Sequence, residues 1–554
     1  MKQTKAKTKP VASVKTESKS STYFIVGGIV LATIILYART LEHGFFAIDD
    51  DVYIRSNALI HFPSWLIFKT FVCQNYHPLT ILSYAFDYLS SGDEAVAYHR
   101  TNLILHLANA VLVFILCNKL LKNVLASAAV SLLFAIHPMH VESVAWIAER
   151  KDLLYSFFFL LALIFYCSYL KDRSIKKLLL VFLLFACSLL SKPQAMPLPF
   201  ILLLFDYFFD RRDLKQALLE KIPFVALSVL FGIITLYSQQ DAQNDFLATD
   251  ANPFVRILFS SYAILIYTVK LIVPFSLSVF YPFPDNDSSM FIYFAAPLIL
   301  IGAAIFIFKF RKNKVLVFGS LFFIISLAPV LQIKSFGAAL LSERYTYIAS
   351  IGVFLPIAFF IFQNQKAART KTVVGFLFYA LALFVIAFIR VGDWGSNKQI
   401  LLQSNKNYPS VYIKQALANQ YGQEGKSDSG LYYLNEAMKQ RPNFPLLYFT
   451  RAHFSGIEFR KGIADVDTAV MLDKNFALAY IFKGLLYAQN GIDDSAMMFI
   501  RKGNNLRKTT DGFLLLAEIH EKNNRTDSAK YYFQKAYDTD PANLTAYQKL
   551  FGSN

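Results

Sequence analysis

The feature that most constrains this chain is a series of long apolar runs that recur from Tyr23 to about Val391. Each run has 15 to 22 residues, close to the roughly 20 residues that a helix needs to cross a bilayer core about 30 Å thick. Because a membrane core forces the backbone to satisfy its own hydrogen bonds, such runs predict helices. The 554 residues are 55% hydrophobic and only 17% charged. We therefore expect an all-α polytopic membrane protein.

The apolar runs stop after Trp394, where the chain becomes polar and rich in tyrosine. This change predicts three parts: a cytoplasmic basic tail (1–22), a polytopic membrane domain (23–394) and a helical-repeat domain (395–554). Eleven spans are expected, at about 23–41, 101–121, 124–146, 153–170, 177–191, 196–210, 222–239, 291–310, 315–333, 346–363 and 373–391.

Charge predicts the orientation. Six of the first twenty residues are lysine, and the loops "NKLLKN", "KDRSIKK" and "DRRDLKQALLEK" are basic, which favours the cytoplasm for all of them. The acidic loop "QQDAQNDFLATDANP" is expected outside. The segment from Pro253 to Pro274 is too short for two crossings and holds Arg256 and Lys270, so we expect an interfacial or re-entrant helix there and an external repeat domain. A twelfth span at this segment would instead put the repeats in the cytoplasm.

The net charge of +17 is accounted for largely by the cytoplasmic loops, so we expect no nucleic-acid partner. The four cysteines, Cys73, Cys117, Cys167 and Cys187, have no spacing typical of a disulfide framework or a zinc site.

The tail carries a repeat of about 34 residues. Aromatic residues recur at Tyr412, Tyr448, Tyr480, Phe513 and Tyr547. Small residues follow at fixed offsets, such as Gly484 and Ala496 after Tyr480, where paired helices cross. This is the tetratricopeptide pattern. About four repeats predict an α-solenoid with a concave groove suited to an extended peptide or a partner protein.

Polar side chains gather where the predicted topology puts the outer face of the membrane. A charge in a membrane span costs about 2.5–3.5 kcal/mol even on insertion scales, so such residues need a reason to be there. The candidates are Asp49, Asp50, Asp51, Tyr53, His77, Asp87, His99, Arg100, Asn102, His106, His137, His140, Glu142, Glu149, Arg150, Lys151, Asp152, Lys192, Glu343, Arg344, Tyr345 and Tyr347.

Each candidate also has a structural interpretation. The three aspartates could form a hydrated turn that caps a helix. His137 and His140 could bind a metal, although packed histidines are commoner, and we expect no metal. Arg150 and Arg344 could be arginines that extend to the membrane interface. The convergence of acids and bases on one face favours catalysis, because a carboxylate can take a proton from a hydroxyl and basic side chains can hold a phosphate.

Several of these polar stretches resemble the motifs of a known family. The stretches "DDDVY", "YHPLTILSYAFDY", "YHRTNLILHLAN", "FAIHPMHVESVAWIAERKDLL", "SKPQAMPLPFILLLFDY" and "SERYTYIASIG", followed by repeats, are similar to the transmembrane and tetratricopeptide-repeat O-mannosyltransferases and their bacterial relatives. The resemblance implies the C-type glycosyltransferase fold, a polyprenyl-phosphate sugar as donor, and protein acceptors recruited by the repeats. The short array favours a bacterial inner-membrane protein with a periplasmic tail, or an ER membrane protein with lumenal repeats if the chain is eukaryotic.

The family pattern D-[DE]-x-x-[YF] falls on Asp49, Asp50 and Tyr53. The resemblance implies Asp49 as general base with Asp50 assisting, and Asp51 as a bystander. It also implies a donor or phosphate site at Glu149, Arg150, Asp152, Lys192, Arg344 and Tyr345, with Tyr53, His77, His99, His137, His140, Glu142 and Glu343 as supporting polar residues. An inverting displacement of this kind needs no cofactor. A lipid or glycan acceptor, a non-enzymatic scaffold and a transporter remain as alternative functions.

Overall fold

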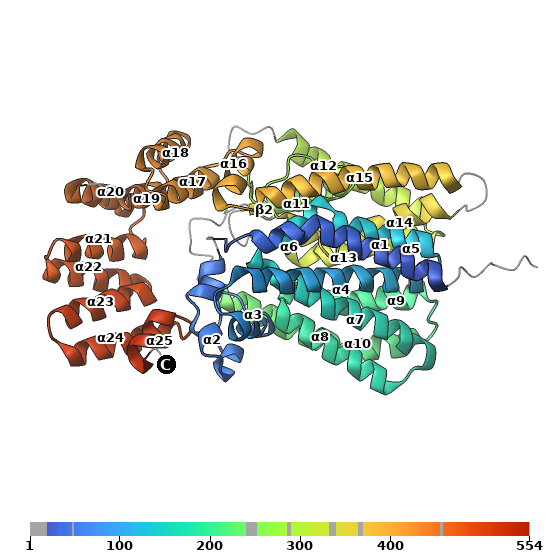
Figure 1. The fold of residues 1–554 in the computed structure, drawn as a ribbon, viewed down its shortest axis with the longest axis horizontal. Helices are drawn as coiled ribbons and strands as arrows, with labels where there is room; N and C mark the ends of the chain where they lie inside the picture. The colour runs from blue at the N-terminus through green and yellow to red at the C-terminus, as the bar shows by residue number, and fades with distance from the viewer. Residues whose placement is uncertain are drawn as a thin grey trace, which may run out of the picture.

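A computed structural model describes residues 19–46, 49–239, 252–284, 290–331, 339–363, 369–454 and 458–552. The predicted all-α architecture is confirmed: a bundle of long helices is followed by an array of shorter helix pairs (Figure 1). Apart from helices, the described residues form one antiparallel pair of short strands, β1 (Tyr281–Pro282) and β2 (Ala339–Leu341).

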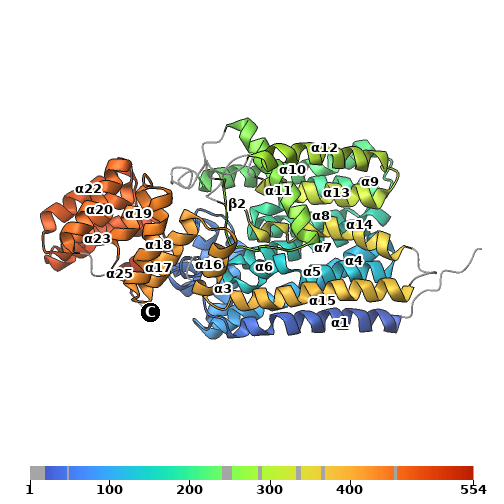
Figure 2. The same cartoon turned by 90° about the horizontal axis from the view of Figure 1, so that it is seen from above.

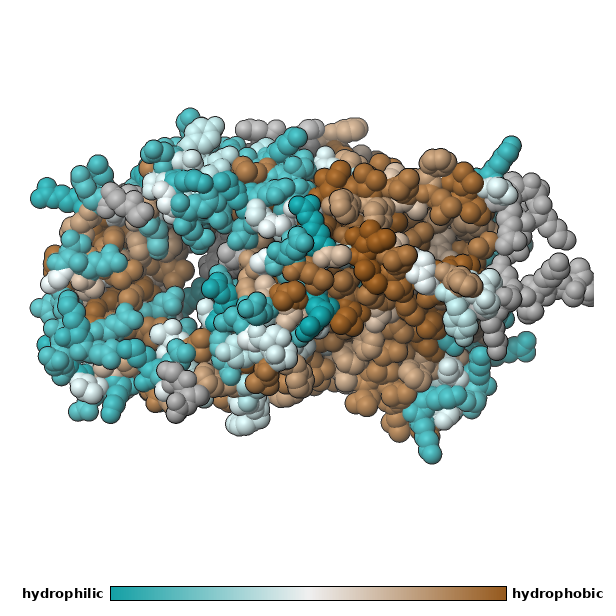
Figure 3. Space-filling model, viewed as in Figure 1, coloured by the Kyte–Doolittle hydropathy of each residue, from teal (hydrophilic) through white to brown (hydrophobic). Residues whose placement is uncertain are grey.

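The bundle holds a helix for each predicted span. Its helices are α1 (Lys19–Tyr37), α4 (Ala95–Leu121), α5 (Val124–Ile136), α6 (Val141–Ala145), α7 (Arg150–Asp172), α8 (Ile175–Ser191), α9 (Leu198–Phe208), α10 (Leu214–Ser238), α11 (Pro253–Ile272), α12 (Phe291–Lys309), α13 (Lys314–Leu327), α14 (Ser350–Phe362) and α15 (Arg369–Asp393). Two short helices, α2 (Ala58–His61) and α3 (Pro78–Ser91), follow α1. Figure 3 shows the apolar surface of this bundle as a brown band between hydrophilic ends.

Within the described ranges, eight helices are long and apolar enough to cross a membrane, or nine if the bent pair α5–α6 counts as one span. This is fewer than the eleven predicted, because α8 and α9 have only 17 and 11 residues and α13 has 14. Length and composition also admit α11, for which the sequence predicted an interfacial or re-entrant helix.

The two ends of α11 contact different parts of the neighbouring helices α12 and α15. Phe254 at its start packs near Phe294 at the start of α12, with ring centroids 6.4 Å apart. At its end, the carbonyl of Ile272 accepts a hydrogen bond from Tyr379, partway along α15. The chain then continues to β1, which lies beside α16 (Asn397–Asn407) at the start of the repeat array. A re-entrant helix stays our prediction.

Close packing inside the bundle depends on small residues. A Cβ atom on Gly319 of α13 would lie 2.5 Å from the carbonyl oxygen of Gly352 of α14, and the reverse distance is also 2.5 Å. Small residues let apolar helices approach in this way when the membrane gives no hydrophobic driving force between them.

The array confirms the repeat pattern. After α16 (Asn397–Asn407) come four antiparallel pairs and a final helix: α17 (Val411–Gln423), α18 (Ser427–Gln440), α19 (Pro445–Ala452), α20 (Phe459–Leu472), α21 (Ala477–Gln489), α22 (Asp493–Leu506), α23 (Thr510–Lys522), α24 (Thr526–Thr539) and α25 (Leu544–Phe551). The small residues lie at the crossings as predicted, since Gly484 of α21 faces Ala496 and Ile500 of α22.

The repeat array and the start of α1 lie at opposite ends of the bundle, and α1 and α15 run side by side between them (Figures 1 and 2). This arrangement is the one that an odd number of crossings requires. The predicted external loop at 239–253 falls almost entirely outside the described residues.

Candidate functional site

The three adjacent aspartates have three different environments. They lie beyond the end of α1, where the chain forms a short π-helical turn (Asp51–Arg55). Asp51 forms an i,i+4 ion pair with Arg55 at the surface, with an O–N distance of 2.9 Å. Such an exposed pair contributes at most about 1 kcal/mol. Asp51 is therefore a solvated turn residue in this structure, and its role as a bystander stays a prediction.

Asp50 is fully buried and bound to the backbone. Its carboxylate accepts a hydrogen bond from the N–H of Phe46 at 2.6 Å and another from the N–H of Ala148 at 2.8 Å. Burial raises the pKa of Asp50 to about 7, although the two backbone N–H groups oppose that shift. Both oxygens of Asp50 are thus occupied, and the side chain ties its loop to the start of α7. Its assistance to Asp49 stays a prediction.

Asp49 has the free carboxylate. Among the described residues, its side chain makes no hydrogen bond and no ion pair, and it is half-buried. Burial raises the pKa of Asp49, and the nearby cation Lys151 partly opposes the increase. An unengaged carboxylate with a raised pKa is suited to accept a proton from a substrate hydroxyl.

A group of buried charges lies at the start of α7. Glu149 pairs with Lys151 and with Nε of Arg344 at 3.2 Å each, and with Lys192 at 3.5 Å. The backbone folds this way because a 3-10 turn (Ile147–Glu149) leads directly into α7. Glu149 therefore brings three cations from three separate segments to one place.

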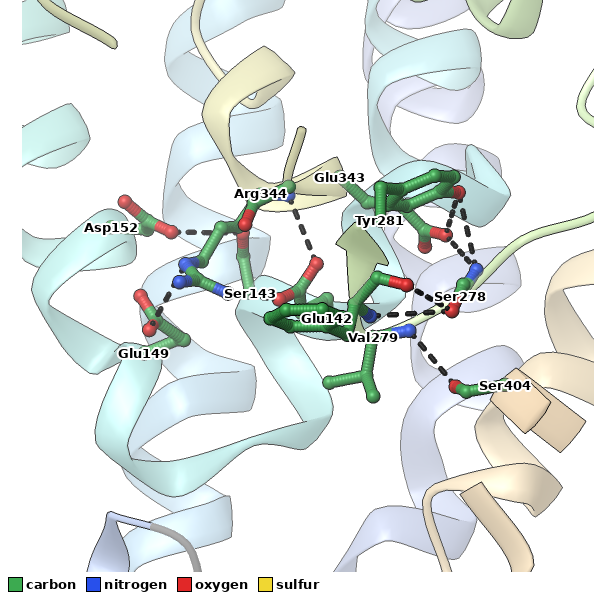
Figure 4. A network of polar contacts seen from close by, with 12 residues as sticks. Glu142, Ser143, Glu149, Asp152, Ser278, Val279, Tyr281, Glu343, Arg344 and Ser404 are labelled. Atoms are coloured by element: carbon green, nitrogen blue, oxygen red, sulfur yellow. Dashed lines mark hydrogen bonds and ion pairs between the residues drawn. The ribbon is translucent and has the colours of Figure 1, made fainter. Parts of the chain in front are cut away.

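Two further carboxylates complete this group. Glu142 forms an ion pair with the Arg344 guanidinium and accepts a hydrogen bond from the Arg344 backbone N–H at 3.2 Å. Asp152 accepts from Lys192 at 2.6 Å and from the Ser143 hydroxyl at 3.2 Å. Figure 4 shows Arg344 between Glu142 and Glu149, with Asp152 beside them. We call Glu142, Glu149, Lys151, Asp152, Lys192 and Arg344 the charged centre.

A cavity of about 160 Å³ adjoins the charged centre. Lys192, Gln194, Asn75, Gln239 and Tyr345 give it a polar side. Its other walls are mainly apolar, formed by Pro193, Met196, Thr235, Pro329, Val330 and Leu331. The cations of the charged centre keep some access to solvent, with exposed side-chain fractions of 14% for Lys192 and 20% for Arg344.

Arg150 does not belong to the charged centre, which corrects the sequence prediction. It is fully buried on the other side of α7, where it pairs with Asp87 at 2.5 Å. Its guanidinium also donates to Asn102 at 2.8 Å and to the Tyr98 carbonyl at 2.9 Å. These contacts join α7 to α3 and α4.

Lys151 takes the place predicted for Arg150. Its ammonium lies 4.7 Å from the ring centre of Tyr53 and pairs with Glu149. The sequence signal for Lys151 was the same as for Arg150, because both stand in "AERKD". Their side chains point about 100° apart on a helix, and only the position of the neighbouring helices decides which one faces the centre.

The predicted supporting residues lie in two settings. Tyr53 is buried beside His77, with ring centroids 5.1 Å apart, and its hydroxyl accepts from Asn75 at 3.3 Å. Burial lowers the pKa of His77 well below its usual range, so the ring is neutral. Tyr345 packs near both Arg344 and Lys192 at the edge of the cavity.

The other three predicted supporting histidines each contact a backbone carbonyl. His99 contacts the carbonyl of Gly44 at 3.4 Å, His137 that of Leu271 at 3.1 Å, and His140 that of Phe134 at 2.7 Å. Among the described residues, no group of three or more His, Cys, Asp and Glu side chains is arranged to hold a metal ion.

Glu343 faces away from its neighbour Arg344. It pairs with Arg390 of α15 at 3.1 Å. It also accepts from the Tyr281 hydroxyl at 2.7 Å and the Ser278 N–H at 2.6 Å (Figure 4). Sequence reasoning missed Arg390, whose signal was an arginine near the C-terminal end of the last predicted span. Glu343 therefore holds the segment that presents Arg344.

The family model described as "Dolichyl-phosphate-mannose-protein mannosyltransferase" matches residues 85–237. Human protein O-mannosyl-transferase TMTC3 is 40% identical over 93 residues, covering 17% of this chain and 10% of that protein. A protein O-mannosyl-transferase of Caenorhabditis elegans is 26% identical over 336 residues, covering 58% of this chain and 47% of that protein.

Over these matched parts, the chain is similar to protein O-mannosyl-transferases.

The matched region contains most of the charged centre but neither Asp49 nor Arg344. The matches with the relatives cited above span from a tenth to less than half of those proteins. A solved structure of an Archaeoglobus fulgidus oligosaccharyltransferase shares 14% identity at a TM-score of 0.39, covering 76% of this chain and 59% of that one. A tetratricopeptide protein of Thermus thermophilus shares 18% at 0.26, covering 33% and 97%.

Proposed function

We propose that this protein is an integral-membrane glycosyltransferase that moves a hexose, such as mannose, from a polyprenyl-phosphate carrier to Ser or Thr hydroxyls of proteins. The observation that carries the proposal is one juxtaposition: the unengaged Asp49 carboxylate lies near the charged centre, which itself borders a cavity. The relatives' names, protein O-mannosyl-transferase, support the same class of reaction.

The proposed step is a single inverting displacement. The acceptor hydroxyl oxygen attacks the anomeric carbon while its proton passes to Asp49. The bond between that carbon and the phosphate oxygen breaks, and its electron pair leaves with the polyprenyl phosphate. Lys192, Arg344 and Lys151 would stabilise the negative charge that develops on the phosphate, since fixed cations act strongly in a site shielded from water. The leaving group is a monophosphate, so the step requires no metal cofactor.

The cavity suits an amphipathic donor. Its polar side holds Lys192, whose ammonium can donate to phosphate oxygens beyond those of Asp152 and Glu149. Its apolar walls come from the short turn Pro193–Ala195, from α10 and from the segment after α13, and they match a polyprenyl chain in character. The phosphate would therefore lie at the charged centre and the lipid would extend away from it.

The array offers a groove for the acceptor. A hollow of about 520 Å³ in the first two repeats is lined by Gln415, Asn419, Gly422, Gln423, Phe449, Thr450, His453 and Phe454. None of these described lining residues is Asp, Glu, Lys or Arg, and burial lowers the pKa of His453 so that it stays neutral. An uncharged, hydroxyl-bearing segment fits such a lining.

The spacing of three amides in this groove matches an extended peptide. Gln415, Asn419 and Gln423 stand four residues apart on α17, which puts them about 6 Å apart along the helix. An extended chain repeats every two residues over about 6.6–6.8 Å. Each amide can both donate and accept, so the row can pair with alternate peptide groups of an acceptor.

We place the reaction on the face of the membrane that carries the repeats, in a bacterial inner membrane with periplasmic repeats. The lysine-rich start of the chain supports a cytoplasmic N-terminus by the positive-inside rule. The repeat array lies at the other end of the bundle (Figure 1). Asp49, the charged centre and the groove would then all face the periplasm.

The test compares Asp49→Asn with Asp51→Asn. Both substitutions remove one negative charge from the same loop, but only Asp49 is placed to accept the proton. We expect Asp49→Asn to lower sugar transfer about 10²–10⁴-fold, with normal membrane insertion, and Asp51→Asn to leave it nearly unchanged. Intact-glycoprotein mass spectrometry of a deletion strain complemented with each variant measures the product. Full transfer by inserted Asp49→Asn would refute the role of Asp49, and a glycan found only on lipid would refute the protein acceptor.

A further inference from the structure

The last helix of the repeat array docks on the membrane domain beside the loop that carries Asp49. Ala58 donates its backbone N–H to the Ala542 carbonyl at 2.7 Å, and Leu544 donates to the Ser56 carbonyl at 3.0 Å. These two bonds make an antiparallel β-bridge centred on Asn57 and Asn543. Ala542 is 6% exposed and packs into the core of the membrane domain rather than that of the array.

Aromatic stacking reinforces this bridge. The rings of Phe62 and Tyr547 stack with centroids 4.7 Å apart and an angle of 15° between their planes. A cavity of about 240 Å³ lies beside the stack and includes residues of both α2 and α25. The array is thus fixed at two ends, since α16 is also bound to the membrane domain through Ser404, which accepts from the Val279 N–H at 3.1 Å.

A short chain of contacts leads from the bridge to Asp49. The buried Asn57 side chain donates to the Tyr53 carbonyl at 3.1 Å. The Tyr53 N–H donates to the Asp49 carbonyl at 2.9 Å. The Tyr53 ring in turn lies against Lys151 of the charged centre. Asn57 therefore connects the tip of the array to both the proposed base and one of the cations.

We propose that the C-terminal tip of the array, through the bridge of Asn543 with Asn57 and the stack of Tyr547 on Phe62, is a positioning element that fixes Asp49 for proton transfer. The array then has a role besides acceptor binding: its last helix completes the site from outside. The positioning role of the tip rests on the proposed function of Asp49. The bridge and the stack are contacts of the structure that do not depend on that function.

One substitution isolates the bridge. Leu544 is the first residue of α25, and Asn543 before it is extended (ψ 114°). Proline is well tolerated at a first helical position and after an extended residue. Leu544→Pro thus removes the N–H that donates to Ser56 and leaves the helix intact. The matched control is Thr510→Pro, which puts proline at the same position of α23, where Thr509 before it is also extended (ψ 142°).

A second pair of variants tests the stack. Tyr547→Ala removes the ring that packs on Phe62, and Tyr547→Phe restores it, so the conservative change should rescue the defect. If Leu544→Pro does not fold, this pair of variants still tests whether the tip of the array positions the loop of Asp49.

Two readouts on the full-length protein separate positioning from folding. In Leu544→Pro and Tyr547→Ala, we expect amide hydrogen exchange at residues 53–58 to rise about tenfold or more. We expect kcat for sugar transfer to fall about tenfold to hundredfold because misplacement of a base weakens the chemical step, with KM for the donor nearly unchanged. Thr510→Pro and Tyr547→Phe should match the wild type in both.

Unchanged exchange in both tip variants would overturn the proposal, and so would faster exchange with an unchanged kcat. If the wild type transfers no sugar at all, the proposed function fails, while the exchange comparison still decides whether the tip holds the loop.

Discussion

Replacement of Asp50 by asparagine separates the positioning role of this residue from the proton transfer proposed for Asp49. The Asp50 carboxylate accepts from Phe46 N–H with one oxygen and from Ala148 N–H with the other. An asparagine side chain has one acceptor oxygen and a donor NH₂ group. One of the two buried N–H groups must then lose its partner, and the other bond loses its charge.

The magnitude follows from the first of these losses, because burial disfavours the charge itself and raises the pKa of Asp50. An unsatisfied buried N–H costs about 1–3 kcal/mol. We therefore expect Asp50→Asn to favour local opening of the loop by about 1–3 kcal/mol. That change corresponds to about 5- to 140-fold faster exchange of the Phe46 and Ala148 amides, because each 1.4 kcal/mol is about tenfold.

Hydrogen exchange with mass spectrometry in detergent measures this opening, with Asp51→Asn as the control in the same loop. Exchange of both amides within about threefold of the wild type would refute the reasoning that Asp50 ties the loop to the start of α7.

The same residue predicts a pH dependence. The pKa of Asp50 is raised to about 7 in the folded protein, above the usual value near 3.9. Between these values the folded state holds more protons than the unfolded state, so stability falls as pH rises through about 4 to 7 and levels off above. Asp50→Asn removes this titration. Its stability deficit should thus be larger at pH 5 than at pH 8, and an equal deficit would contradict the assignment.

Two further predictions concern residues away from the proposed chemistry. Arg150→Ala should lower the free energy of unfolding by about 3–5 kcal/mol because it leaves Asp87 buried without its partner. The control Arg55→Ala, at an exposed position, should have little effect. Thermal unfolding in detergent compares the two variants, and equal unfolding temperatures would show that Arg150 is not structural. Gly484→Ala should destabilise the repeat array by about 1–3 kcal/mol, since its new Cβ would lie against Ile500 and 2.8 Å from the Ala496 carbonyl. Gly375→Ala, with open space at its Cβ, serves as the control. Equal unfolding temperatures of the two variants would refute the close crossing of α21 and α22.

The repeat array shows how far local sequence determines structure here. The interval of about 34 residues between aromatic anchors predicted four helix pairs, and the structure has them. Such repeats pack mainly on their neighbours, so the information that specifies each contact lies within about one repeat. The apolar runs likewise predicted a helix at each span, because a long apolar segment in lipid must satisfy its own backbone hydrogen bonds.

The roles of adjacent charged residues were decided only by the tertiary structure. Asp49 and Asp50 differ because Ala148, 98 residues away from Asp50, donates its N–H to one of them. Arg150 and Lys151 differ because α3 and α4 enclose one face of α7 and the charged centre occupies another. Composition and spacing predicted that acids and bases lie near one another. They do not specify which residue, distant in the sequence, contacts each side chain. Hydrogen bonds and ion pairs are directional and short, so the partner that the fold brings within about 3 Å settles the role.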